Sequence, residues 1–235
     1  MSQTSAGPDG RPRCRWCLET PEMIAYHDAE WGFPVNDDQR LFEKLCLESF
    51  QSGLSWRTIL AKRDHFRKAF DAFALDKVAG YTEQDIERLL RDEGIVRHRG
   101  KIEAAINNAR RALELVECEG SLAAFFWRYE PDAKPRTASV SALAGSAKEQ
   151  LSEPLSISVT AESAKEQLSE PLSISVSAES ARLSKDLKKL GWTFVGPTTL
   201  YSFMQAMGLV NDHAEGCVIR ADAERARGLF QRPVR

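Results

Sequence analysis

The chain has 235 residues, of which 43% are hydrophobic and 28% charged, and its formal net charge is −2. This length allows one large domain or two small ones with a substantial core, and the composition excludes a disordered chain. No apolar stretch is long enough for a transmembrane helix, and residues 1–13 lack the apolar segment of a secretory signal. These features predict a cytoplasmic protein.

The cysteine content bears on redox state and metal binding. An odd number of cysteines in a reducing compartment disfavours a disulfide framework and favours metal binding or simple burial. The five cysteines are Cys14, Cys17, Cys46, Cys118 and Cys217.

Helical signals dominate the first half of the chain. Polar capping candidates precede an apolar pattern over residues 36–47, and Ser55 can cap a helix whose apolar stripe reaches Phe73. Thr82 and Asp85 have capping-box spacing ahead of a further helix. Gly94 is expected to end that helix.

The second half continues in the same way. Residues 101–116 place apolar side chains at helical spacing, 121–129 form a short aromatic helix, and two more helices are expected near 183–190 and 198–208. No alternating strand pattern is convincing outside an internal repeat. The predicted fold class is therefore all-α.

The internal repeat is nearly perfect. Residues 146–162 recur at 163–179 with a single difference, Thr160 against Ser177. Two copies are too few for a repeat array that buries a common face. Residues 140–180 carry two lysines and six glutamates, a net charge of −4, which leaves +2 on the rest of the chain. We interpret this region as an acidic, solvent-exposed insert.

Cysteine and histidine residues near both ends have the spacing of metal ligands. Cys14 and Cys17 form a C-x2-C pair followed by His27, and His213 and Cys217 form an H-x3-C pair. Two imidazole nitrogens and two thiolates make a closed, structural zinc site that would join the two ends of the chain. Simple burial explains the spacing equally well, and spacing does not decide between Cys14 and Cys17.

The segment 94–110 combines a glycine-bounded turn with basic residues. Such a turn, followed by a helix N-terminus, lets backbone N–H groups approach a phosphate, as in helix-hairpin-helix units that bind DNA. Most turns of this kind only connect two helices. The candidate contacts with the DNA backbone are Arg97, Arg99, Gly100 and Lys101.

Aromatic residues gather around one carboxylate in the N-terminal quarter of the sequence. Aromatic residues at this density are more often core than a base-stacking pocket. Glu48, however, lies beside the apolar face of its helix, where a carboxylate must be paired, protonated or functional. The group consists of Trp16, Tyr26, Trp31, Glu48 and Trp56.

Taken together, these segments resemble the DNA-3-methyladenine glycosylase I family of bacteria, within the helix-hairpin-helix glycosylase superfamily. The resemblance runs from about Cys14 to about Cys217, leaving out the duplicated insert. It rests on RCRW, AYHDAEWGFP, LFEKLCLESFQSGLSW, GIVRHRGKIEAAINNAR, FVGPTTLYSFMQAMGLVNDH and HAEGC. The family lacks the superfamily's usual catalytic aspartate, and no aspartate follows the expected hairpin here until residue 132.

The resemblance implies an enzyme that flips 3-methyladenine out of alkylated double-stranded DNA and hydrolyses its N-glycosidic bond, leaving an abasic site. It implies Glu48 and Tyr26 as catalytic residues that bind the base together with Trp56, and Trp16 and Trp31 as pocket lining. It also implies one structural zinc ion per chain, held by Cys14, His27, His213 and Cys217.

The expected organisation is one glycosylase domain between two flexible tails. The domain spans 14–220 and contains a helix-hairpin-helix at about 82–118, and the tails are 1–13 and 221–235. A monomer without an obligate protein partner is expected. The alternatives are a non-catalytic DNA-binding protein, a family member inactivated by its insert, and a glycosylase with lyase activity that uses Lys101 as the Schiff-base amine.

Overall fold

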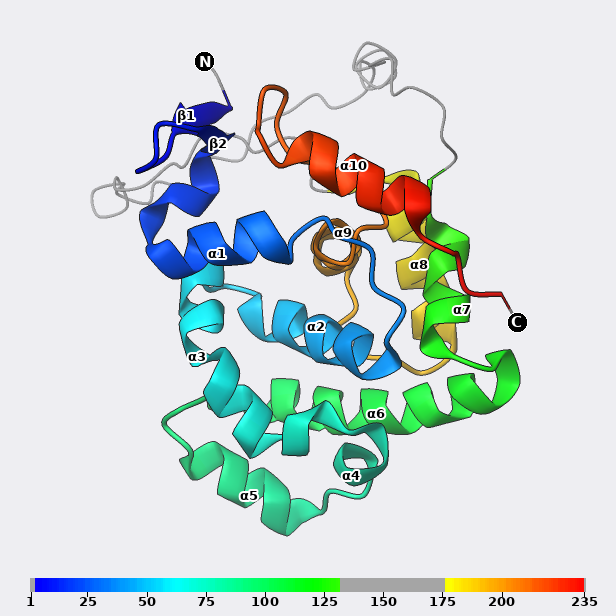
Figure 1. Ribbon diagram of the computed structural model, residues 1–235. Helices are drawn as coiled ribbons and strands as arrows, with labels where there is room; N and C mark the ends of the chain where they lie inside the picture. The colour runs from blue at the N-terminus through cyan, green and yellow to red at the C-terminus, as the bar shows by residue number, and fades with distance from the viewer. Residues whose placement is uncertain (1–2, 132–175, 235) are drawn as a thin grey trace, which may run out of the picture. The chain divides into compact units, whose positions relative to one another are not determined.

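The computed structural model describes residues 3–131 and 176–234, and these residues are mostly helical (Figure 1). The duplicated segment lies outside the described residues except at its end, where Ser177 caps α8. The α-helices are α1 (Pro21–Ala29), α2 (Asp38–Gln51), α3 (Trp56–Ala69), α4 (Leu75–Ala79), α5 (Glu83–Arg91), α6 (Arg99–Glu119), α7 (Leu122–Phe126), α8 (Ala178–Lys189), α9 (Pro197–Ala206) and α10 (Arg220–Leu229). Short 3-10 turns are η1 (Arg15–Glu19), η2 (Asp71–Phe73) and η3 (Trp127–Tyr129).

The capping residues identified in the sequence start their helices as expected. The side chain of Asp37 accepts a hydrogen bond from the backbone N–H of Arg40 at the start of α2. Ser55 caps α3 in the same way, and Thr82 forms a reciprocal capping box with Asp85 at the start of α5. Each side chain satisfies an N–H group that the helix itself leaves free.

The N-terminal segment is folded, so the prediction of a flexible tail over 1–13 is wrong for the residues described. Strands β1 (Thr4–Ala6) and β2 (Pro12–Cys14) pair in an antiparallel ladder. The guanidinium of Arg13 is buried and forms ion pairs with Asp9 and with Asp28 of α1. Strands of three residues are too short to show an alternating pattern, which is why sequence analysis missed them.

The C-terminal segment is also folded, against the prediction of a tail over 221–235. Helix α10 occupies most of it, and Ala223 on its inner face is buried. The guanidinium of Arg227 lies 2.9 Å from the carboxylate of Glu130, which tethers α10 to the end of the chain's first half. Only one residue of α10 is buried, so its sequence carries little apolar pattern.

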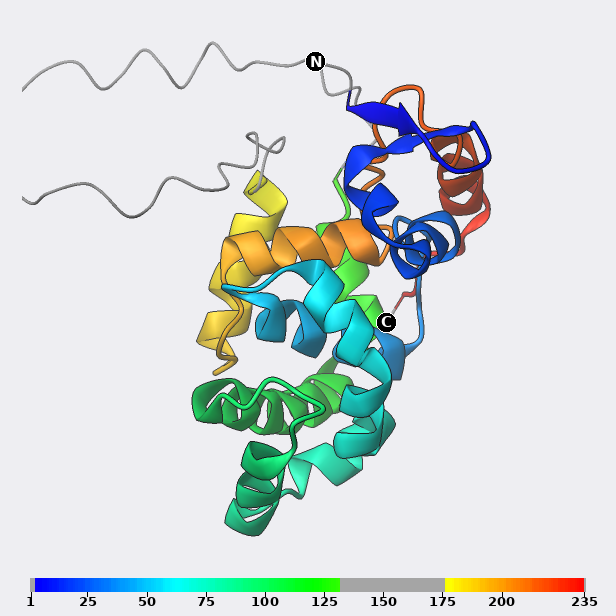
Figure 2. The ribbon, with the colours of Figure 1, turned by 90° about the vertical axis from the view of Figure 1, so that its left-hand side faces the viewer.

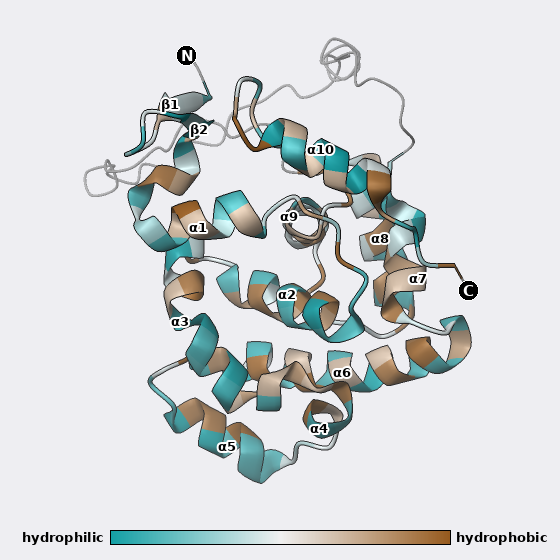
Figure 3. Ribbon diagram, in the orientation of Figure 1, coloured by the Kyte–Doolittle hydropathy of each residue, from teal (hydrophilic) through white to brown (hydrophobic). Residues whose placement is uncertain are grey.

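Helix α2 forms the centre of the core, packed against α3, α6, α7 and α9. Its residues Leu41, Phe42 and Leu45 are almost completely buried. Full burial of one such side chain contributes about 1.5–3 kcal/mol. The same packing fixes the orientation of the polar residues on α2, among them Glu48. Hydrophilic and hydrophobic residues alternate along α5 and α6, as expected for helices with one buried face (Figure 3).

Helices α4, α5 and α6 lie at one end, and β1, β2, α1 and α10 gather at the other (Figure 2). The backbone N–H of Val218 donates to the carbonyl of Pro12, so the two ends of the chain meet there. Among the described residues, no helix has the length and apolar character needed to cross a membrane.

Candidate functional site

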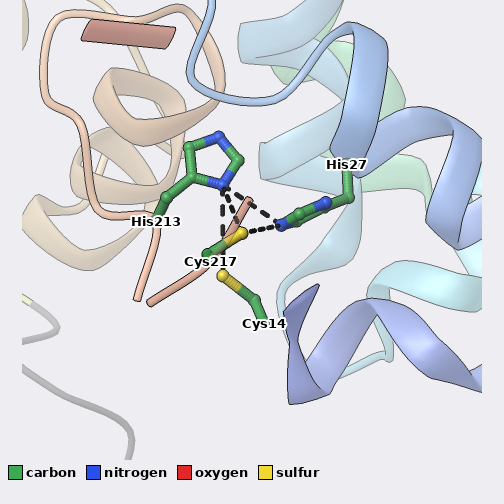
Figure 4. A group of neighbouring side chains, drawn as sticks. All are labelled: Cys14, His27, His213 and Cys217. Atoms are coloured by element: carbon green, nitrogen blue, oxygen red, sulfur yellow. Dashed lines mark hydrogen bonds between the residues drawn. The ribbon is translucent and has the colours of Figure 1, made fainter. Parts of the chain in front are cut away.

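The four predicted metal ligands converge into one buried cluster (Figure 4). Their ligand atoms all lie within 4.8 Å of one another. His27 Nε2 is 3.1 Å from His213 Nδ1, and the Cys217 Sγ is 3.6 and 3.7 Å from these two nitrogens. The Cys14 Sγ lies 4.0 Å from His213 Nδ1. Ligand atoms around a tetrahedral zinc ion are separated by roughly 3.3–3.8 Å, so the cluster can hold such an ion.

The outer nitrogen of each imidazole has a fixed acceptor. His27 Nδ1 lies 2.7 Å from the carboxylate of Asp28, and His213 Nε2 lies 3.0 Å from the carbonyl of Trp31. Carboxylates and carbonyls only accept hydrogen bonds, so both outer nitrogens are donors. The two inner nitrogens of the neutral rings then present lone pairs to each other. A cation between them resolves this conflict, as in metal sites with carboxylate- and carbonyl-bound histidines.

The hydrogen bonds of the two sulfur atoms indicate which N-terminal cysteine is suited to bind a metal. The backbone N–H of Ala214 donates to the Cys14 Sγ, a contact that suits a thiolate ligand. The thiol of Cys17 instead points to the carbonyl of Cys14, at 3.1 Å. Burial lowers the pKa of His213 to about 4, with the neighbouring His27 adding to the effect, so this ring is neutral and available as a ligand.

The loop after α1 requires a glycine at one position. Gly32 has a φ of +85°, and a Cβ atom there would lie 2.9 Å from His213 Nε2. Any other residue would displace this ring from the Trp31 carbonyl. Gly208 has the matching restriction, because a Cβ there would meet the backbone of Phe33 at 2.5 Å. The two glycines let the C-terminal segment pack closely against the loop that carries Trp31.

The predicted aromatic residues also lie together, next to the metal-ligand cluster. The rings of Trp16 and Trp31 are 5.1 Å apart, and those of Tyr26 and Trp56 are also 5.1 Å apart. Helix α1 carries both Tyr26 and its neighbour His27. The helix that carries His27 of the cluster therefore also carries one ring of the aromatic group.

Glu48 is buried on α2, and Lys44 lies one turn earlier on the same helix. Glu48 is 6% exposed and Lys44 is 5% exposed. Burial raises the pKa of Glu48, and the Lys44 ammonium opposes this shift. Burial also lowers the pKa of Lys44, which Glu48 opposes. The Nζ of Lys44 donates a hydrogen bond of 2.9 Å to the hydroxyl of Tyr26. The Lys44 ammonium thus lies against the rings of Tyr26 and Trp56 in a region of low solvent access.

The candidate DNA-backbone residues lie at the junction of α5 and α6. Arg97 and Arg99 are exposed, and Arg99 forms an ion pair with Glu83 at 2.7 Å. Gly100 lies in the first turn of α6, where backbone N–H groups have no partner within the helix.

Lys101 has a different role from the predicted phosphate contact. Its ammonium is buried and donates to the carbonyls of Phe50 and Ser52, at 2.9 and 2.6 Å. These carbonyls end α2, where a cation is favourable. The same engagement argues against Lys101 as a Schiff-base amine, because the amine faces the protein interior.

We expect Lys101→Met to lower the free energy of unfolding by about 2 kcal/mol, because two buried carbonyls lose a charged donor. Urea unfolding measures this loss. The variant is expected to leave the salt dependence of DNA binding unchanged. Loss of a true phosphate contact would reduce the slope of log Kobs against log salt concentration by about 1. A reduced slope for Lys101→Met would support the predicted phosphate contact of Lys101. Arg97→Gln, which removes an exposed candidate contact, serves as the comparison for the slope.

Three residues of the site were missed by sequence analysis. Lys44 could have been found from its position four residues before Glu48, which places both on one helix face. Asp28 follows His27 directly and holds its ring. Arg13 was assigned to a tail, and its contact with Asp28 depends on the fold of the whole N-terminal segment.

Comparison with known proteins identifies the class. The sequence profile of the methyladenine glycosylase family matches residues 16–166 and 158–221. A curated relative, "DNA-3-methyladenine glycosylase 1" of Escherichia coli (strain K12), is 43% identical over 205 residues, covering 87% of this chain and 95% of the relative. The mostly helical fold resembles that of the glycosylases among the solved structures.

Solved structures agree with this class. A crystal structure of 3-methyladenine DNA glycosylase I has a TM-score of 0.69 and 41% identity, covering 88% of this chain and 98% of its own. A structure that describes 3-methyladenine recognition by the Staphylococcus aureus enzyme has a TM-score of 0.67 and 35% identity, covering 86% and 93% of the two chains. The chain therefore belongs to the methyladenine glycosylase family.

Proposed function

We propose that this chain excises 3-methyladenine from alkylated DNA, with the base held by Glu48, Tyr26 and Trp56. The enzyme is a DNA-3-methyladenine glycosylase, which hydrolyses the N-glycosidic bond and leaves an abasic site. The observation that supports this assignment of the site is a buried carboxylate on α2 whose charge reaches Tyr26, where burial and then Glu48 raise the pKa of the hydroxyl, in a member of this family.

The chemistry explains why these residue types suffice. Methylation at N3 makes the base cationic in the nucleotide, so the base departs as a neutral molecule without needing a proton. The enzyme has to flip the nucleotide out, hold the base and admit water to the sugar. Little further activation is required, consistent with the absence of an aspartate between the α5–α6 junction and Pro131.

Glu48 and Tyr26 are proposed as the catalytic residues because they contact the reacting base. The Glu48 carboxylate accepts hydrogen bonds from the exocyclic amine side of the base and attracts its positive charge. Tyr26 adds a hydrogen bond through its hydroxyl. Discrimination against adenine follows from the charge of the methylated base and from its better leaving-group ability.

Trp56, Trp16 and Trp31 are proposed to complete the base site. The ring of Trp56 can stack on the electron-poor base, a contact with cation–π character. The ring of Trp16 contacts that of Tyr26, and Trp31 in turn contacts Trp16, so both support the position of Tyr26.

The α5–α6 junction is proposed as the helix-hairpin-helix that holds the DNA backbone. Arg97 and Arg99 supply positive charge, and the N–H of Gly100 at the start of α6 faces a phosphate. Lys101 contributes by anchoring α6 to the end of α2. Such contacts position the duplex without reading its sequence.

The Cys14, His27, His213 and Cys217 cluster is proposed to hold one structural zinc ion. With four protein ligands such an ion has no open position, so its contribution is to fold stability. It would join β2 and α1 to the segment before α10, and so fix the helix that carries Tyr26.

The remaining organisation is also a proposal. We place the glycosylase domain at 14–220, extended by the folded segments on both sides, and expect a cytoplasmic monomer that needs no protein partner. We expect the duplicated insert to leave the residues of the base site unaffected. The alternatives are a DNA-binding protein without activity and a family member inactivated by the insert.

Base release from methylated duplex DNA tests the proposed function. The purified chain is incubated with the DNA, and chromatography identifies the liberated base. We expect 3-methyladenine to be released without 7-methylguanine. Absence of any released base, from protein that is folded and binds DNA, would contradict the proposed activity. Deleting residues 163–179, one copy of the repeat, then shows whether the insert blocks an otherwise complete site.

A further inference from the structure

The ammonium of Lys44 lies against the same rings that we assign to the base. Its Nζ is 4.4 Å from the centroid of the Tyr26 ring and 4.3 Å from that of Trp56. It also donates to the Tyr26 hydroxyl. The Lys44 side chain is only 5% exposed, so it is not a solvated surface lysine. A base held by Tyr26 and Trp56 therefore has this ammonium as its neighbour.

The charge of Lys44 is only partly balanced by its surroundings. Two of the nearby glutamates already have arginine partners at 2.7 and 2.8 Å. Glu48 and the two aromatic faces remain as the groups that stabilise the ammonium. The titratable and charged groups that act on Lys44 come from three helices and one helix end: Tyr26 of α1 and Glu30 directly after it, Glu43 and Glu48 of α2, and Arg63 of α3.

We infer that the Lys44 ammonium promotes bond cleavage by repelling the positive charge of the bound base. This inference rests on the proposed function, in which Tyr26, Trp56 and Glu48 hold that base. It adds a residue that contacts the reacting base and acts on the chemical step.

The electron balance of the reaction explains the effect. The C1′–N9 bond breaks heterolytically, and its electron pair moves to N9, which turns the base from a cation into a neutral molecule. Positive charge develops at C1′, water adds there, and one proton leaves to solvent. Repulsion by a fixed ammonium beside the base is strongest before cleavage and fades as the base becomes neutral. An interaction that is less unfavourable in the transition state than in the bound substrate raises the rate.

Lys44 and Glu48 then have opposite effects on the two steps. The Glu48 carboxylate attracts the cationic nucleotide and favours binding, but the same attraction holds the base in its charged form. Lys44 offsets this attraction and favours the neutral product. With both present, the site recognises the methylated base by ring contacts and hydrogen bonds without trapping it as a cation.

Lys44→Met removes the charge and keeps most of the side-chain volume. We expect its single-turnover rate of 3-methyladenine release to fall about 10- to 100-fold, with DNA affinity unchanged or tighter. Lys44→Arg, which keeps the charge, should retain most of the rate. Lys68→Met makes the same change of charge on the exposed face of α3 and is expected to have no effect. A rate for Lys44→Met equal to that of the wild type would overturn the inference.

Ligand charge separates this role from simple steric or structural ones. Calorimetry compares neutral 3-methyladenine with the fixed cation 3,9-dimethyladeninium. We expect Lys44→Met to improve binding of the cation relative to the neutral base by about tenfold or more. If the variant bound both ligands more tightly by the same factor, Lys44 would merely occupy space in the site. If it bound both more weakly by the same factor, Lys44 would merely support the fold. Either result would overturn the inference.

The pH profile supplies a readout that a structural role would not move. Lys44 is effective only as an ammonium, so its contribution is present below its pKa and is lost as the pH rises through that pKa. Burial lowers this pKa from the ordinary lysine value, against the opposing charge of Glu48. We expect an alkaline decline in the single-turnover rate that Lys44→Arg abolishes. Persistence of the same decline in Lys44→Met would contradict the inference.

The two proposals fail in distinguishable ways. If the wild-type chain releases no 3-methyladenine from methylated DNA, the proposed function fails. If the wild type releases it and the Lys44 variants show neither the altered rate nor the altered ligand preference, the inference about Lys44 fails alone.

Discussion

Glu48→Gln is expected to reduce the rate of 3-methyladenine release at sub-saturating enzyme concentration by about 100-fold, because the cationic nucleotide binds more weakly. The carboxylate is 6% exposed, so its attraction for a cationic base is weakly screened by solvent. Glutamine keeps the shape and one acceptor oxygen but loses the charge. Binding of free 3-methyladenine should also weaken, because the amide cannot accept at both oxygens.

Two controls make this test specific to the site. Glu43→Gln removes a carboxylate from the same helix, where Glu43 pairs with Arg67, and should leave the rate of base release nearly unchanged. The unfolding transition of Glu48→Gln should remain cooperative, because glutamine fills the same volume and makes no cavity. Unchanged affinity for 3-methyladenine in calorimetry would refute the assignment of Glu48.

Local sequence signals predicted most of the helices. Asp37, Ser55 and the pair of Thr82 and Asp85 are capping residues whose contacts span only three positions, so their sequence neighbours contain the necessary information. The apolar periodicity of α6 was equally direct, since this helix buries one continuous face.

Helices without an apolar stripe were harder to predict. The inward side of α1 carries Tyr26 and His27, a phenol and an imidazole, and no run of aliphatic residues. The position of α10 depends on Arg227 and Glu130, which are 97 positions apart in the sequence. Such contacts form only once the rest of the chain has folded, and no local pattern records them.

In the candidate site, too, some features follow from the local sequence and others depend on the fold of the whole chain. The residue types and spacing suggested a metal site and left the choice between Cys14 and Cys17 open, and the resemblance to a family selected Cys14. The structure agrees with that selection by bringing Cys14 into the cluster. It also places the Lys101 ammonium on the last carbonyls of α2, a role that a basic residue in a glycine-bounded turn does not suggest.

Loss of the metal ion is expected to destabilise the protein strongly. We expect Cys217→Ser, or removal of the ion by a chelator, to lower the free energy of unfolding by an amount on the order of 4 kcal/mol. For a chain of this size the corresponding fall in Tm is roughly 8–16 °C. Differential scanning calorimetry measures the unfolding transition, and inductively coupled plasma mass spectrometry measures the zinc content.

The physical reason lies in the cluster itself. Without a cation, the inner nitrogens of His27 and His213 face each other at 3.1 Å with their lone pairs, inside a buried site. Each outer nitrogen is already committed as a donor, to Asp28 and to the Trp31 carbonyl. The rings cannot both turn without losing these hydrogen bonds. The contact of β2 with the segment before α10 is therefore expected to open, and hydrogen exchange there should increase before exchange in α2.

Cys17→Ser is the matched control. Cys17 is buried three residues from Cys14, but its thiol only donates to the Cys14 carbonyl, a bond that a serine hydroxyl can reproduce. This variant should keep one zinc ion per chain and lose about 1 kcal/mol or less. If Cys17→Ser lost the ion while Cys217→Ser retained it, the ligand set would be wrong. If both retained it, the four-residue cluster would not be the zinc site, and the mutual orientation of its histidines would need another cause.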